Sequence, residues 1–128
     1  MNAQVSDSGP AAYIAAVVLL YVELPETPLS ARIQDRQLAR RLHDLGIPLQ
    51  LVESAMLLAS LRRLVRPADL PSLPPIRSLA YFQPVIEELL VHPMPDNYLE
   101  YLRLKLNTFA QRKPGPAEVQ KNTFSDDR

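Results

Sequence analysis

The sequence predicts an all-α fold, a compact bundle of about five helices joined by proline-rich connections. Apolar residues recur at helical spacing in several segments of the chain. Most of the 13 prolines lie between those segments. Few segments are suited to pair as strands. The length of 128 residues, with 47% apolar and 22% charged residues, fits one globular domain.

The first predicted helix covers Ala11–Leu24. Ser8 or Gly9 could cap it, with Pro10 in its first turn. Its alanines favour a helix and its three valines favour a strand, and we choose the helix because a strand would lack partners. The apolar stretch is twelve residues long, too short to cross a bilayer as a helix, and no basic residue precedes it. We therefore expect a buried element of a cytoplasmic protein.

Two prolines, Pro25 and Pro28, end that helix. The next helix is predicted to begin with Ser30 or Asp35 as its N-cap. Its apolar stripe consists of Ile33, Leu38, Leu42 and Leu45. Gly46 suits a left-handed C-cap, and Pro48 starts the chain in a new direction.

The segment 48–65 is the strongest helix prediction, and it is apolar around most of its circumference. A helix of this kind is usually central and contacted on several sides. Four prolines between residues 67 and 75 then predict a stiff, extended connection, with at most one short helical turn.

Two further helices complete the domain. Ser78 could cap the first, which contains Pro84 and should kink or break there. Asp96 is predicted to cap the last helix, which reaches about Arg112. Residues 10–113 would form the single helical domain, with a disordered N-terminus over residues 1–9 and a disordered tail over residues 114–128.

No residue pattern indicates catalysis, so we expect no enzyme, cofactor, metal site or small-molecule substrate. The chain has no cysteine, and its three glycines form no phosphate-binding loop. His43 and His92 are 49 residues apart and lack the spacing of metal ligands. Glu87 and Glu88 are neighbours on a helix, so their side chains diverge.

Arginine is the most informative residue type. Net charge is zero, but residues 32–113 carry twelve bases and eight acids. All eight bases between residues 32 and 77 are arginine, whose guanidinium suits phosphate geometry. An alternative is a solvated face partly paired with Asp35, Asp44 and Asp69. The residues we predict to contact nucleic acid are Arg36, Arg40, Arg62, Arg63, Arg66, Arg77 and Tyr81.

Two segments resemble the small helical domain of the DnaD-like primosome proteins, over about residues 35–91. The first is Gly46 followed by Leu51-Val52-Glu53, Ala55-Met56 and Ala59. The second is Tyr81, Val85 and Leu89 at four-residue steps, where Leu89 replaces the family's tryptophan. The resemblance implies binding of single- or double-stranded DNA during replication initiation. It also implies a DNA-contact role for Tyr81 and the arginines near the proline-rich turn.

The sequence therefore gives two functional hypotheses. The first is a non-enzymatic DNA-associated accessory protein, for replication initiation on a plasmid, phage or mobile element. The second is a protein–protein adaptor or subunit that docks through an apolar face, with a protein partner or a second copy of itself. That face would belong to the 11–24 helix or to the 48–65 helix. A standard recognition helix is not expected at 48–65, because its exposed face would be too apolar for a DNA groove.

Overall fold

The computed structural model describes residues 9–112, and over that range the chain forms helices and no strand, as predicted. The ends predicted to be disordered lie outside the described residues, except for Gly9. Lys113, the last residue of the predicted helical domain, also lies outside them. The elements in chain order are α2 (Pro10–Glu23), α3 (Ile33–Asp44), α4 (Leu49–Leu64), the 3₁₀ helix η1 (Leu79–Phe82), α5 (Gln83–Val91) and α6 (Tyr98–Arg112).

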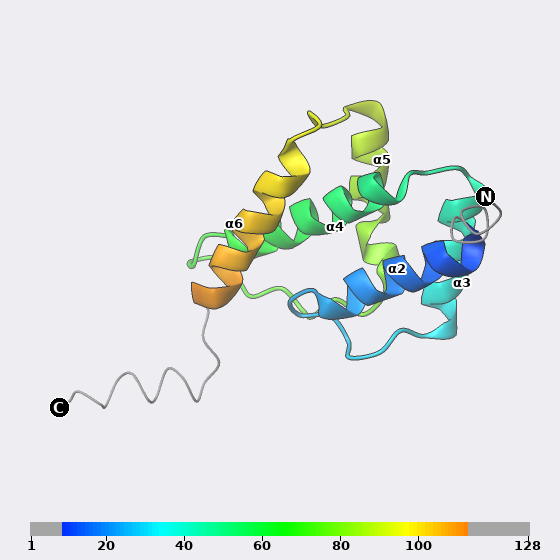
Figure 1. Ribbon diagram of the computed structural model, residues 1–128. Coiled ribbons are helices and arrows are strands. Elements are labelled where there is room, and N and C mark those ends of the chain that lie inside the picture. Colours follow the sequence, from blue (N-terminus) through cyan, green and yellow to red (C-terminus); the bar gives the residue numbers. More distant parts are fainter. Residues whose placement is uncertain (1–8, 113–128) are drawn as a thin grey trace.

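The α4 helix lies in the middle of the bundle, as its apolar sequence predicts. It packs against α2, α5, η1 and α6, and α2 packs in turn against α3 (Figure 1). The main core joins α2, α3, α4, η1 and α5. A second, smaller apolar cluster joins α4 to α6 through Leu57, Leu61, Leu99, Leu102 and Leu106. No helix in the described range has the length and apolar character needed to cross a membrane.

The open choice between helix and strand for the first element is decided in favour of the helix. The α2 helix begins at Pro10 after Gly9, and Val17 and Tyr21 are its fully buried residues. The Tyr13 hydroxyl donates to the Ile47 carbonyl at 2.7 Å. Burial and the nearby negative charge of Asp35 raise the pKa of Tyr21 to about 12.

The start and the buried face of α3 differ from the prediction. Its N-cap is Arg32, and neither Ser30 nor Asp35 holds that place. Asp35 lies three residues later, and its carboxylate accepts the Arg32 backbone N–H at 2.9 Å. Ile33 and Leu45, predicted as core, are 69% and 73% exposed because they flank the helix ends, away from the packed face. The buried face consists of Asp35, Leu38, Ala39 and Leu42.

Gly46 ends α3 as the sequence predicts. Its φ is +78°, in the left-handed region that glycine adopts without strain. The Gly46 N–H donates to the His43 carbonyl at 2.9 Å, and the Ile47 N–H donates to the Leu42 carbonyl at 3.1 Å. This is a complete Schellman motif, and it buries Ile47 against the main core.

The connections after α4 follow the proline positions. Residues 67–78 run without a helix, with one turn closed by the Leu70 N–H and the Pro67 carbonyl at 3.2 Å. Pro84 lies in the first turn of α5, so the predicted break falls just before it, between η1 and α5. Asp96 was predicted to cap α6, but that helix begins at Tyr98, directly after Asn97. A turn bond from the Tyr98 N–H to the Pro95 carbonyl shifts the start.

Candidate nucleic-acid interface

The seven residues predicted to contact nucleic acid fall into two groups in the structure. Arg36 and Arg40 lie on the exposed side of α3, and Arg77 lies in the connection before η1. The other four residues, which line one hollow beside the proline-rich connection, are Arg62, Arg63, Arg66 and Tyr81. The two groups differ in how far their charges are already neutralised.

Arg63 is a structural residue, because its side chain is only 7% exposed. It forms an ion pair with Glu26, donates to the Pro74 carbonyl at 2.7 Å and donates to the Tyr81 hydroxyl at 3.2 Å. Burial disfavours its charge, but the hydrogen bonds to Tyr81 and Glu26 outweigh burial and raise the pKa of Arg63. Its guanidinium thus links α4 to three other segments, which contain Glu26, Pro74 and Tyr81.

Arg62 and Arg66 are also engaged. Arg62 makes a two-pronged ion pair with Glu88, at 2.9 and 2.7 Å, and this hydrogen bonding lowers the pKa of Glu88. Arg66 donates to the Pro71 carbonyl at 3.0 Å. The proline-rich connection is therefore held by Arg63 of α4 and by Arg66 just beyond the end of α4, whereas the sequence predicted both as phosphate ligands.

Tyr81 remains half-exposed, and its ring contacts the side chains of Arg63 and Phe82. The Arg63 guanidinium carbon lies 5.4 Å from the ring centre, and the Phe82 ring meets it edge-on at 5.2 Å. The resemblance assigns Tyr81 a role in DNA contact, and here the ring is oriented by Arg63.

The arginines on and beside α3 are more exposed than Arg63 and Arg66. We define the α3 arginine surface as Arg32, Arg36, Arg40, Arg41 and Arg77, all of which are exposed. Arg77 belongs to it because Arg77 and Arg32 line the same hollow, together with Glu26, Thr27 and Pro28. Arg32 and Arg41 were not among the predicted contacts, although Arg32 precedes Arg36 by one helical turn and so shares its face.

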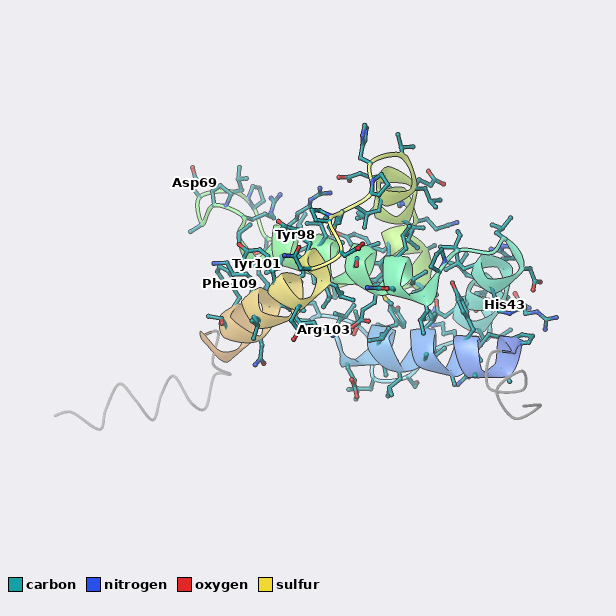
Figure 2. The ribbon with its side chains drawn as sticks, turned by 45° about the horizontal axis from the view of Figure 1, so that its top comes forward. His43, Asp69, Tyr98, Tyr101, Arg103 and Phe109 are labelled. Carbon is teal, nitrogen blue, oxygen red and sulfur yellow. The ribbon has the colours of Figure 1, made fainter. Side chains whose placement is uncertain are left out.

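Two exposed carboxylates lie near the α3 arginine surface, Asp44 on α3 and Glu26, which pairs with Arg63. Asp44 pairs with Arg40 at 3.2 Å, and hydrogen bonds from His43 and then Arg40 lower the pKa of Asp44. Asp35 is buried beneath the helix and bonds to backbone N–H groups, so the alternative of a solvated arginine face is wrong in including Asp35 as a partner. Asp69 lies far away, at the tip of the proline-rich connection (Figure 2).

No family model, curated protein or solved structure matches the chain. The DnaD-like resemblance therefore stays a prediction. Its three spaced residues lie along η1 and α5, with Leu89 buried, Val85 half-buried and Tyr81 facing out.

Other polar and aromatic side chains gather at two separate places, beside His43 and along α6, where Arg103 pairs with Glu53 and Glu100. His43 lies edge-on to Tyr13 at 5.3 Å, at the α3 end of the molecule (Figure 2). Tyr98 and Tyr101 stack at 5.1 Å on α6, away from His43 in the same view. Within the described range, no group of three or more histidine and carboxylate side chains could hold a metal ion.

Proposed function

We propose that the protein is a non-enzymatic DNA-associated accessory protein that contacts phosphates through the α3 arginine surface. The observation that supports this proposal is the five exposed arginines on and beside α3, where the nearby exposed carboxylates among the described residues are Asp44, paired with Arg40, and Glu26, paired with Arg63. Guanidinium groups at such a surface suit the backbone phosphates of a nucleic acid.

Charge separation within the domain strengthens this proposal. Residues 9–112 carry eleven bases and ten acids, a net charge of +1. The α3 arginine surface with Asp44 accounts for +4, so the rest of the domain carries −3. A polyanion would be steered to one side of the protein by this separation, even though the whole domain is almost neutral.

Binding to DNA should depend strongly on salt and on α3. Fluorescence polarisation with labelled single- and double-stranded oligonucleotides, from low to moderate salt, measures both. The double variant Arg36→Ala/Arg40→Ala should weaken binding at least about tenfold and reduce the salt slope by about 2, because two phosphate contacts are lost.

The matched control for this test is Arg62→Ala/Arg103→Ala. It changes the net charge equally, but it removes arginines that pair with Glu88 and Glu53 outside α3. We expect it to bind nearly as well as the unaltered chain. Equal losses in both double variants would contradict the assignment to α3, and no binding of the unaltered chain at low salt would refute DNA association.

A role in replication initiation on a plasmid, phage or mobile element, and with it a cytoplasmic location, rests on the resemblance described above. Phosphate contacts of this kind do not read base sequence. We therefore expect the α3 arginine surface to provide affinity for DNA. A partner protein would then place the protein at a replication origin.

A second candidate function, a subunit that docks through an apolar helix face, is supported by α2. The helix has no charged residue before Glu23, yet Ala11, Ala12, Ala15 and Leu19 are exposed, Leu19 by 56%. An uncharged, apolar face is typical of contacts between identical subunits, so we assign its partner as a second copy of the chain.

Light scattering tests this candidate function. The average molecular mass in solution should rise with protein concentration, and Leu19→Glu should abolish the rise. A strict monomer would exclude this candidate.

A further inference from the structure

We infer that the hollow between α4, the proline-rich connection and the η1–α5 junction binds a short peptide segment of a partner protein, with an apolar side chain next to a carboxylate. We call this hollow the α4–η1 pocket. Its lining residues are Ala59, Arg62, Arg63, Arg66, Leu73, Tyr81, Pro84 and Val85. Its lining shares no residue with the α3 arginine surface, so peptide binding and DNA binding can be tested with separate variants.

The shape of the α4–η1 pocket suits one apolar side chain. Its volume is about 360 Å³, at the small end of the range for ligand sites. Ala59, Leu73, Pro84 and Val85 supply an apolar lining, and the arginines supply the polar groups. Apolar walls with a few fixed polar groups are the usual composition of a recognition pocket.

The charge at the pocket is what identifies the ligand. Arg62 and Arg63 are neutralised by Glu88 and Glu26. Arg66 is half-buried and anchored to the Pro71 carbonyl, and no carboxylate of the described residues pairs with it. One positioned guanidinium thus keeps a full charge beside apolar walls, and a carboxylate would satisfy its remaining N–H groups.

Tyr81 adds a second polar group to the same pocket. Its hydroxyl oxygen accepts a hydrogen bond from Arg63, so its own O–H group is free to donate towards a carboxylate. The ring is held by the Arg63 guanidinium, which fixes the direction of that donor. A carboxylate between Arg66 and Tyr81 would accept hydrogen bonds from one charged donor, the Arg66 guanidinium, and one neutral donor, the Tyr81 hydroxyl. The protein already holds both donors in place.

Phosphate is a poorer ligand for this pocket than a carboxylate. Glu88 and Glu26 hold two negative charges against the lining arginines and would repel a polyanion. Three arginines and two glutamates leave a net charge of +1, which matches a single carboxylate. The α3 arginine surface, at +4 with Asp44, would compete better for nucleic acid.

The test is an NMR titration of the full chain, labelled with ¹⁵N, against two synthetic peptides blocked at both ends. One peptide has the sequence Gly-Ser-Leu-Glu-Ser-Gly, and the other has Gln in place of Glu. We expect amide shifts around Arg66 and Val85, a dissociation constant below about 1 mM for the first peptide, and at least about tenfold weaker binding of the second.

Arg66→Ala should weaken binding of the Glu peptide about tenfold, while the control Arg36→Ala leaves it unchanged. If Arg66→Ala fails to fold, the comparison of the Glu and Gln peptides on the unaltered chain still decides the result. Three outcomes would overturn the inference: no pocket shifts at millimolar peptide, equal binding of both peptides, or pocket shifts caused only by a single-stranded oligonucleotide. The DNA proposal is tested separately, through the α3 variants.

Discussion

Replacing Asp35 with alanine should lower the free energy of unfolding by about 3–4 kcal/mol. The Asp35 side chain is 2% exposed, and its carboxylate accepts two backbone N–H groups. One belongs to Arg32, at 2.9 Å, and the other to Leu79, also at 2.9 Å and 44 residues away. The alanine variant removes both acceptors and leaves the Leu79 N–H buried without a partner, which is the larger cost.

Urea denaturation followed by circular dichroism measures this loss. Asp35→Asn should lose roughly half as much, because its amide oxygen can still accept one of the two N–H groups. Asp44→Ala is the matched control on the same helix. Its carboxylate is exposed and pairs only with Arg40 and His43, so we expect less than about 1 kcal/mol. Equal effects at the two aspartates would contradict a structural role for Asp35.

Replacing Leu102 with alanine should cost about 3 kcal/mol and act mainly on α6. Leu102 is buried in the small cluster between α4 and α6, which meets the main core through the partly buried Leu24, Leu58 and Met94. Among the helices, α6 makes its extensive contacts with α4 alone. The lost methyl groups therefore weaken a contact that has no substitute elsewhere.

Hydrogen exchange distinguishes local from global effects of this change. Amide protons of α6 should exchange much faster in Leu102→Ala, while those of α2 and α3 lose less protection. Leu104→Ala, two residues along the same helix, is the control because Leu104 is 62% exposed, and it should change stability by less than about 0.5 kcal/mol. A uniform loss of protection would show instead that α6 unfolds only with the whole domain.

Local sequence signals were enough to predict most of the fold. Gly46 predicted the end of α3, Pro84 predicted the break before α5, and the apolar circumference of 48–65 predicted the central helix. The face of α3 was less predictable. Ile33 and Leu45 match a helical stripe by spacing, but spacing does not reveal that Asp35 would point inwards to meet the Leu79 N–H.

In the candidate site, too, the features set by residues close in sequence were predictable, and those set by residues far apart in sequence were not. Arg32, Arg36 and Arg40 lie on one helix face, so their spacing predicts a common surface. The engagement of Arg62 and Arg63 depends on Glu88 and Glu26, which are 26 and 37 residues away in sequence. Net charge over a segment cannot distinguish arginines that are already paired from those that are not.

The bond between Asp35 and the Leu79 N–H also bears on how the chain folds. Pairs such as α2 with α3, and α4 with α5, are near neighbours in sequence and should form quickly, because little loop entropy opposes them. The Asp35 contact instead closes a span of 44 residues, across α4 and the whole proline-rich connection. We expect the two helical halves to form early and this carboxylate to join them late, so that Asp35→Ala mainly accelerates unfolding and hardly slows folding.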